Sequence, residues 1–387
     1  MIISKLINSD LLDLRIKFLA AGFDLRFVGG CVRDVLANLK PKDIDLCTDA
    51  TPDEQIDIYK QHNIRYIETG LQHGTVSVVL DSVVYEITSL RIDAETDGRH
   101  AVVVYTRNWI EDLARRDFTM NAMSLTFDGE LIDPFGGFND LQNNLVKFVG
   151  DPMERIREDY LRILRWFRFR GRFGMTKNAA DLSAVKLLAH GLEDISRERV
   201  WSEISRILAG NNGPQIMREI HDTQAARWIN LPRVCWVNEA TNIHNLTCDP
   251  VTILVALYGD HAPLILKAWK ASSREINQAD WLSKYQFDDC LFPMYHMAMS
   301  DISGEWAAQL AALRGGDSFV QEVLRAWVPP AFPVSGNDLM AMNVKPGPQM
   351  GEILKKLRHK WAFSKCNMER CELLTKTVDI IQNYAKN

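Results

Sequence analysis

Two aspartates separated by a single residue are the feature of this sequence that most directly suggests chemistry. Asp43 and Asp45 occur in PKDIDLC, shortly after the paired glycines Gly29 and Gly30. Side chains alternate along a strand, so a strand here would direct both carboxylates to one face and Ile44 to the other. A hard cation such as Mg²⁺ takes oxygen ligands, usually one or two carboxylates together with substrate phosphates. The spacing predicts a metal site, with a polar patch at a sheet edge as the alternative.

A third carboxylate follows in the segment VVYEITSL. Glu86 stands between Tyr85 and Ile87, and a strand would direct those two side chains to the opposite face. A lone carboxylate in the middle of a strand is costly to bury unless it is paired or bound to a metal. We therefore expect Glu86 to be the third acid of the site.

The glycines before the aspartates suit a phosphate. Gly29 and Gly30 precede the helical segment CVRDVL, where bare N–H groups can bind an anion. Arg33, one turn further on, can add charge-assisted hydrogen bonds. The segment GGCVRD matches neither the P-loop pattern nor G-x-G-x-x-G, which argues against a P-loop enzyme and a dinucleotide dehydrogenase. The sequence predicts a triphosphate beside a metal.

The segment RRDFTMNAM combines charge with an amide. Asp117 and Asn121 are four residues apart, on one face of a predicted helix, and follow Arg115 and Arg116. A carboxylate beside an amide can hydrogen-bond a ribose hydroxyl, and arginine pairs with phosphate. The alternative is an ordinary ion pair on a helix.

The segment REDYLRILRWFRFR repeats arginine every third residue. Arg162, Arg165 and Arg168 interrupt an otherwise apolar helix, and Asp159 is the i,i+3 neighbour of Arg162. Arginine can donate to O2 and N3 of cytosine or to N1 of adenine, while aspartate accepts from the exocyclic amine. This pair could read a base without a nucleic-acid template. The alternative is a set of surface ion pairs, including one to Glu158, worth a few tenths of a kcal/mol each.

The elements that position these residues change type along the chain. Up to about residue 150 the patterns alternate, with a helix from its expected cap Ser9 to near Gly22 and strands at LRFVGG and KDIDLC. TPDE has the form of a capping box that starts at Thr51, and two later strands form a hairpin through Asp81–Ser82. From about 151 the periodicity is helical. An α+β head followed by an all-helical remainder is predicted.

We expect four domains. They are a catalytic-looking α/β head over residues 1–150 and three helical parts over residues 151–210, 211–327 and 328–387. The proline-rich segment VPPAFPVSG at 328–336 marks the last boundary.

Charge is uneven although the net charge is only −5. Residues 147–177 contain nine Lys or Arg against four Asp or Glu, and residues 345–387 contain the same numbers. Such basic stretches could follow a phosphate backbone, although basic helices are also commonly just solvated. Nucleic acid is therefore a candidate partner.

Composition argues against several classes of protein. No apolar run was found that approaches the roughly 20 residues of a membrane span, and no signal-peptide core opens the sequence, so we expect no membrane partner. Seven cysteines without a Cys-x-x-Cys argue against a disulfide framework and a structural zinc site. We expect a reducing intracellular compartment, with cytoplasm and mitochondrion both open. The pair His221–Asp222 is interpreted as a helix surface pair, because no second such set accompanies it.

Five segments occur in an order that resembles a known family. They are FVGGCVRDVL, KDIDL, RRDFTMNAM, DPFGG and REDYLRILRWFRFRGRFG. The order is similar to that of the class II tRNA nucleotidyltransferases, the CCA-adding enzymes, and their relatives the bacterial poly(A) polymerases. The likeness covers about the first 210 residues and returns at FPVSGNDLM and GPQMGEILKKL.

The resemblance implies a fold and an activity. The fold would be a polymerase-β-like catalytic head with a mixed sheet, followed by a helical neck that selects the nucleotide, a helical body and a helical tail that binds tRNA. The activity would be template-independent addition of CMP and AMP to the 3′ end of tRNA, from CTP and ATP with Mg²⁺ bound at Asp43 and Asp45. The helical body and basic tail would grip the acceptor end of the tRNA by backbone and shape.

The resemblance also implies roles for single residues. Arg116 would lie at the nucleotide, and the motif around it would recognise the ribose. Asp159 and Arg162 would select CTP or ATP. Arg165 and Arg168, further along the same segment, would hold the nucleotide.

Three further segments acquire roles by the same resemblance. Gly136 and Gly137 would be hinge positions, residues 91–106 would form a flexible loop, and ERVWSEI, which contains Glu198 and Arg199, would brace the helices. A plain turn at the two glycines and a mobile connection are the alternatives.

Other activities on the same scaffold stay open at this point. They are poly(A) synthesis, addition of only CC or only A, and RNA binding by an inactive polymerase fold. The sequence leaves both a monomer and a homodimer open.

Overall fold

The computed structural model describes residues 6–68, 70–96, 101–174, 176–233, 237–287, 292–299 and 302–384. The chain divides into two compact units. The first contains residues 1–212 and 219–231, and the second contains residues 213–218 and 232–387. The expected head and neck fall in the first unit, and nearly all of the expected body and tail in the second. The boundaries near 150 and 328 stay predictions.

A mixed sheet forms the centre of the head. Its strand order is β3-β4-β5-β2-β1-β8-β9, and β2 runs parallel to β5 while the other neighbouring pairs are antiparallel. The strands are β1 (Leu25–Val28), β2 (Asp45–Thr48), β3 (Arg65–Ile67), β4 (Thr75–Leu80), β5 (Val83–Ser89), β8 (Ser124–Leu125) and β9 (Leu131–Ile132). This sheet confirms the α+β fold class.

A separate hairpin, β6 (Arg91–Thr96) with β7 (Ala101–Tyr105), occupies most of the segment expected to be a flexible loop. Residues 97–100, between these two strands, lie outside the described part of the chain.

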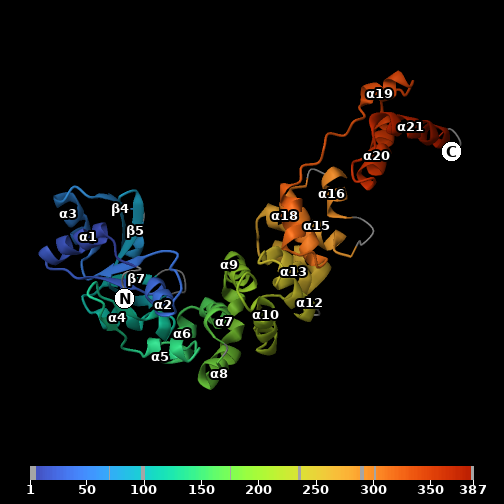
Figure 1. Cartoon of the computed structure of the whole chain (residues 1–387). Coiled ribbons are helices and arrows are strands. Elements are labelled where there is room, and N and C mark those ends of the chain that lie inside the picture. Colours follow the sequence, from blue (N-terminus) through green and yellow to red (C-terminus); the bar gives the residue numbers. More distant parts are fainter. Residues whose placement is uncertain are drawn as a thin grey trace. The chain divides into compact units, whose positions relative to one another are not determined.

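Helices α1 (Ser9–Ala20), α2 (Gly30–Leu36) and α3 (Pro52–Gln61) share a hydrophobic core with the sheet (Figure 1). Phe18 and Tyr59 from the helices and Phe27 and Ile87 from the strands are fully buried in it. Because strand side chains alternate, the neighbours of the inward residues point to the opposite face. That face is the one that carries Asp45.

Several local expectations can be checked directly. The capping box at Thr51 is confirmed, because its side chain accepts from Glu54 N while Glu54 accepts from Thr51 N. The hairpin is confirmed, with Asp81 and Ser82 at φ 43° and 67°. The expected cap of the first helix was wrong by one residue, because the Asn8 side chain accepts from Leu11 N at 2.9 Å.

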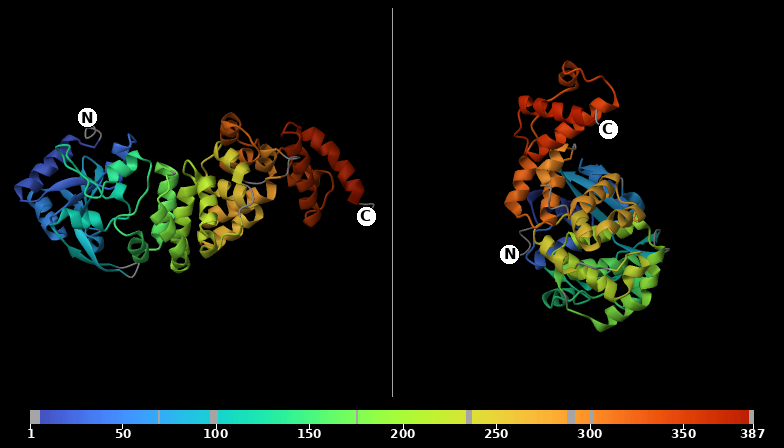
Figure 2. Two further views of the ribbon diagram at one scale, coloured as in Figure 1. Left: turned by 90° about the horizontal axis from the view of Figure 1, so that it is seen from below. Right: turned by 90° about the vertical axis from the view of Figure 1, so that its right-hand side faces the viewer.

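The rest of the first unit is mainly helical; Figure 2 shows the helices from α6 to α9 in green. The elements are α4 (Trp109–Ala114), α5 (Gly137–Gln142), α6 (Pro152–Glu158), α7 (Leu161–Phe173), α8 (Ala179–Leu188), α9 (Arg197–Leu208) and α11 (Ala225–Trp228), with short turns η2 (Leu71–His73), η3 (Thr119–Asn121) and η4 (Ala189–Asp194). Helix α10 (Gly213–Asp222) contributes residues to both units.

One expected helix is broken. The pattern REDYLRILRWFRFR predicted a continuous helix, but α6 ends at Glu158 and α7 begins at Leu161. The junction packs tightly, since a methyl group added to Gly191 would lie 2.0 Å from Tyr160 Cδ1.

The described part of the second unit is helical. Its elements are α12 (Val237–His244), α13 (Pro250–Tyr258), η5 (Gly259–His261), α14 (Ala262–Ala268), α15 (Ser273–Tyr285), α16 (Pro293–Met299), α17 (Gly304–Leu313), α18 (Ser318–Ala326), α19 (Gly336–Ala341), α20 (Pro348–Phe363) and α21 (Arg370–Tyr384). Tyr295 of α16 shares a core with Ile353, Leu357 and Trp361 of α20.

One segment of this unit corrects the sequence analysis. Pro250–Ala268 is long and apolar enough to span a membrane, with a mean hydropathy of 1.3. In the structure 61% of it is buried, and Gly259, at φ 53°, stands between α13 and α14. Leu254 and Leu257 are completely buried. The segment is packed as the core of a helical unit.

Candidate active site

A pocket of about 450 Å³ in the first unit collects most of the predicted nucleotide-binding residues. Nine of those ten residues line it, and Arg168 is the exception. The nine are Gly29, Gly30, Arg33, Arg116, Asp117, Asn121, Asp159, Arg162 and Arg165. They come from α2, the segment between α4 and η3, and the junction of α6 with α7. The structure therefore brings three separate sequence motifs to one place.

Gly29 and Gly30 allow other side chains to lie close to the backbone of the turn. Gly29 precedes α2 with φ 64°, and a Cβ there would lie 2.8 Å from Arg116 Nη1. A Cβ on Gly30 would lie 4.0 Å from Asp45 Oδ2. Glycine is favoured at the first position by its left-handed φ, and a side chain there would displace the end of Arg116. The turn thereby places the predicted metal ligand next to the pocket.

Arg33 is held firmly although it is expected to bind a ligand. Its side chain is buried, Nη1 donates to Asn121 Oδ1 at 2.6 Å, and Nε donates to Asp34 Oδ1 at 2.9 Å. The guanidinium lies 4.6 Å from the centre of the Phe173 ring. Asp34 also accepts from Arg172 Nη2 at 2.9 Å, which links α2 to α7. Arg33 is thus oriented before any nucleotide binds.

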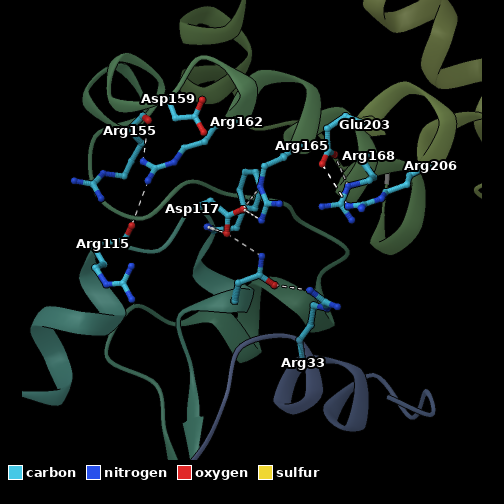
Figure 3. A network of polar contacts seen from close by, with 12 residues as sticks. Arg33, Arg115, Asp117, Arg155, Asp159, Arg162, Arg165, Arg168, Glu203 and Arg206 are labelled. Carbon is cyan, nitrogen blue, oxygen red and sulfur yellow. Dashed lines mark hydrogen bonds and ion pairs between the residues drawn. The ribbon is translucent and has the colours of Figure 1, made fainter. Parts of the chain in front are cut away.

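Asp117 and Asn121 lie side by side as expected, but not on an α-helix. Helix α4 ends at Ala114, and Asn121 belongs to the turn η3. Asn121 Nδ2 donates to Asp117 Oδ1 at 2.9 Å, and Arg165 Nε donates to Asp117 Oδ2 at 2.8 Å (Figure 3). Burial acts to raise the pKa of Asp117, but Arg165 and Asn121 outweigh it and lower the pKa. Asp117 is therefore a carboxylate at neutral pH.

Asp159 and Arg162 both line the pocket, at the break between α6 and α7. Asp159 Oδ1 accepts from Leu161 N at 3.0 Å, and Oδ2 accepts from Arg199 Nη2 at 2.8 Å. Arg162 Nη1 donates to Glu158 Oε2 at 2.6 Å. The expectation of one helical face was wrong, because Asp159 precedes α7. The carboxylate and guanidinium nevertheless share the pocket.

Arg168 lies away from this group. Its Nε donates to Glu203 Oε2 at 2.6 Å, and its guanidinium lies 4.3 Å from the centre of the Phe169 ring. Glu203 also pairs with Arg206 (Figure 3). In the structure Arg168 connects α7 to α9, and its contact with a nucleotide stays a prediction.

The pocket includes four residues that the site prediction omitted, namely Arg115, Leu161, Phe169 and Arg199. Arg199 was expected only to brace the helices. Its contact with Asp159 spans 40 residues of sequence, so no local pattern could reveal it.

A buried acid that the sequence analysis also missed orients two arginines. Asp112 Oδ1 accepts from Arg115 Nε and Asp112 Oδ2 from Arg116 Nη2, both at 3.0 Å. The sequence contained a signal for these contacts, because Asp112 precedes Arg115 by three residues and Arg116 by four.

The predicted metal ligands lie at the sheet beside the pocket. Asp45 begins β2 and stands opposite Glu86 of the parallel strand β5. Burial raises the pKa of Asp45, and the carboxylates of Glu86 and Asp43 raise it further, while Arg116 opposes this. Carboxylate oxygens are the ligands that a hard cation takes. The residue types of Asp43 and Asp45 therefore fit Mg²⁺.

Two expectations about these acids were wrong. Strand β2 begins at Asp45, so Asp43 lies in the preceding bend, where it is exposed. Glu86 is also exposed, with Tyr85 and Ile87 buried on the other face, so it needs no partner to offset burial. Within the described ranges, no three His, Cys, Asp or Glu side chains converge closely enough to hold a metal. The role of Glu86 as third ligand stays a prediction.

Of the two glycines expected to form a hinge, Gly137 is tightly packed, and an added Cβ on Gly136 would meet nothing within 4 Å. Gly136 has φ 72°, and Asp133 accepts from Gly137 N at 2.7 Å. A Cβ on Gly137 would lie 2.0 Å from Thr119 O. This geometry is that of a turn, and the hinge role of the two glycines stays a prediction.

Two family models match the chain. The model described as the poly A polymerase head domain matches residues 25–147. The model described as the probable RNA and SrmB-binding site of polymerase A matches residues 180–233. The first covers the sheet and the acids, and the second covers α8 and α9.

Known proteins are similar over nearly the whole length. The mitochondrial CCA tRNA nucleotidyltransferase 1 of Homo sapiens is 36% identical over 390 residues, which covers 96% of this chain and 90% of that protein. The CCA-adding enzyme of Levilactobacillus brevis is 30% identical over 385 residues, which covers 93% and 94%.

Solved structures share the fold. The CCA-adding enzyme of Bacillus stearothermophilus in complex with CTP superposes with a TM-score of 0.78 at 24% identity, covering 98% of both chains. The Thermotoga maritima enzyme in complex with tRNA gives a TM-score of 0.67 at 18% identity. Together with the sequence identity across the full length, these findings show that the chain belongs to the CCA-adding tRNA nucleotidyltransferases.

Proposed function

We propose that this protein adds two CMP residues and then one AMP to the 3′ end of tRNA, using CTP and ATP and no nucleic-acid template. The observation that carries this proposal is the single pocket that combines Arg33 and Arg165 with the pair Asp159 and Arg162, next to Asp45. Cations suit a triphosphate, and the pair offers both an acceptor and a donor to a base. The relatives described above are named for CCA addition rather than poly(A) synthesis.

The triphosphate would lie along the glycine turn and the arginines. Arg33 is oriented by Asp34 and Asn121, so little side-chain entropy is lost when it donates to a phosphate. Mg²⁺ held by Asp43 and Asp45 would neutralise the developing charge and activate the 3′-hydroxyl of the tRNA. Asp117 and Asn121, fixed by their mutual hydrogen bond, would orient the ribose.

Base choice follows from hydrogen-bond polarity. Cytosine and adenine both place an exocyclic amine beside a ring nitrogen that accepts, which matches the acceptor Asp159 and the donor Arg162. Uracil and guanine place a carbonyl where the amine would be, and a carbonyl facing a carboxylate is repelled. Arg199 would act as a positioning residue, because it fixes one oxygen of Asp159.

An end-addition assay tests the proposal. Purified protein, Mg²⁺ and a tRNA transcript that lacks CCA are incubated with CTP, with ATP, or with both. We expect two C residues with CTP alone, one further A when ATP is added, and no product on a transcript that already ends in CCA. A long A tract from ATP would contradict the proposal and indicate a poly(A) polymerase, and addition of only C or only A would indicate a partial enzyme.

We further place the protein in the cytoplasm or the mitochondrion. The relatives include mitochondrial and bacterial proteins. Among the residues that the structure describes, five cysteines are free thiols. Burial raises the pKa of Cys31 to about 11 and that of Cys47 to about 12, so neither forms a reactive thiolate at neutral pH.

A further inference from the structure

The second unit contains a pocket of about 540 Å³ that the proposed function does not use. Its walls come from α12, α13, η5 and the ends of α15 and α17. Ile243, Val255, Ala256 and Leu313 give it an apolar lining. Ligand sites typically combine such walls with a few polar groups that fix the orientation of the ligand. The polar groups of this pocket therefore indicate what it could bind.

Gln286 is the most informative of them. The residue is only 9% exposed, and its Nε2 has no hydrogen-bond partner in the described part of the chain. A Cβ on Gly259, which also lines the pocket, would lie 3.7 Å from this Nε2. The amide nitrogen of Gln286 therefore faces space that a side chain at position 259 would fill. A buried amide without a partner is costly, and a ligand that pairs with it would remove that cost.

Other buried glutamines do not share this feature. Gln278, in the same helix, donates to Asp249 Oδ2 at 2.9 Å, and Gln309 donates to Glu305 Oε1 at 2.8 Å. Gln55 donates to Ser89 Oγ at 2.9 Å in the first unit. Among the buried glutamines that the structure describes, Gln286 is the one whose amide nitrogen lacks a partner.

The rim carries charges of both signs. Glu239 and Asp260 line the pocket and are exposed, and His261 and Arg314 also line it. Carboxylates accept from hydroxyl groups, which a ribose offers. A nucleoside therefore suits this pocket, with its ribose hydroxyls at the carboxylates.

We propose that this pocket binds a nucleoside whose base presents a lactam edge, as uracil and guanine do. A lactam offers a carbonyl and an N–H side by side, and the amide of Gln286 can pair with both. The flat faces of the base would lie against the apolar walls, as in the recognition of unstacked RNA bases. The nucleoside can be a base of the RNA partner or a free nucleotide. An RNA base as the source rests on the proposed function, whereas a free nucleotide as the source does not.

Binding of uridine to the full-length protein is measured by calorimetry, because uracil is not expected to suit the pocket at Asp159. Competition by a tRNA transcript identifies the source. Loss of the uridine signal on addition of tRNA indicates an RNA base, and an unchanged signal indicates a free nucleotide. If uridine does not bind and a 4-thiouridine-labelled transcript forms no cross-link to the pocket, the proposal is overturned. Neither measurement requires catalysis, so a failed end-addition assay would leave this test intact.

Two variants locate the site, and a third is the control. Gln286→Leu removes the amide at similar volume, and Ala256→Leu fills the pocket; both should weaken uridine binding by about tenfold or more. Gln286→Leu should lower Tm less than Gln278→Leu, because the amide nitrogen it removes has no partner in the described part of the chain. Gln278→Leu removes a paired glutamine and should lower Tm without changing affinity. An affinity that neither pocket variant changes would overturn the proposal.

Discussion

Asp159 receives hydrogen bonds from two different elements. The N–H of Leu161 at the start of α7 fixes Oδ1, and Arg199 of α9 fixes Oδ2. A base amine that enters the pocket must therefore share an oxygen that is already oriented. If Asp159 selects the base as proposed, base choice also depends on α9, which contributes Arg199 to the pocket lining.

Replacing Arg199 should weaken discrimination more than catalysis. The ion pair is partly exposed, at 34% for Arg199 and 24% for Asp159, so its loss should cost about 0.5–1 kcal/mol. We expect Arg199→Gln to lower the ratio of kcat/KM for CTP over UTP by about two- to fivefold. The matched control is Arg197→Gln on the same helix, where Arg197 donates to Trp228 O and does not line the pocket. An equal loss for both nucleotides would show that Arg199 only stabilises the fold.

Residue types could be predicted from the sequence better than their partners. Arg33 and Asp159 were identified because glycine context and arginine spacing are local signals. The contacts of Asp159 with Arg199 and of Arg33 with Asn121 join residues far apart in the chain. Such contacts depend on tertiary packing, which local spacing does not encode.

At the scale of elements, periodicity gave the existence of helices and strands but not their ends. The capping box at Thr51 and the hairpin turn at Asp81 are local chemistry and were predicted correctly. The break at Asp159 was missed, because it depends on the packing of Tyr160 against Gly191. The pattern KDIDLC likewise suggested a strand that in fact begins only at Asp45.

Helix α8 contributes a buried acid at its contact with the head. Asp181 is 2% exposed, and its Oδ2 accepts from Phe148 N at 3.3 Å. Burial raises its pKa to about 7, Asp140 adds to this, and Phe148 N–H and Lys147 oppose it. The folded-state pKa lies above that of the unfolded chain, so the folded state binds the proton more tightly. This contribution to stability is present below about pH 4 and is lost as pH rises through about 7.

Asp181→Asn should therefore raise Tm most at pH 8, less at pH 5, and have little effect near pH 4. The amide keeps an acceptor for Phe148 N but cannot ionise, so the cost of burying a charge, on the order of a few kcal/mol at high pH, disappears. Thermal unfolding of both proteins across this pH range measures the difference. A Tm difference that does not change with pH would show that Asp181 does not titrate in the folded protein.

At the scale of the whole molecule, we expect substrate binding to be divided between chemistry in the first unit and a basic surface in the second. Helix α20 exposes Lys355, Lys356 and Lys360, which line a groove of about 320 Å³ together with Met299 and Ile380. The expected tRNA-binding tail thus has a positively charged face over an apolar floor. Phosphate backbones bind such faces with a strong dependence on salt.

The triple variant Lys355→Ala, Lys356→Ala, Lys360→Ala should raise KM for tRNA by about tenfold, with kcat little changed. The slope of log affinity against log salt should fall in magnitude by about 2, because fewer counterions are released. Lys40→Ala with Lys60→Ala, on exposed residues of the head, is the control. An unchanged KM and salt slope in the triple variant would exclude α20 from the tRNA interface.

The central claim is that Asp45 holds the metal of nucleotidyl transfer beside a pocket that binds the nucleotide. Asp45→Asn is compared with wild type and with Asp57→Asn, an exposed acid of α3, for CMP incorporation and for tRNA binding. We expect incorporation by Asp45→Asn to fall by about a thousandfold or more, equivalent to ~4 kcal/mol, with tRNA affinity unchanged. Asp57→Asn should match wild type. Incorporation by Asp45→Asn at the wild-type rate would contradict the account.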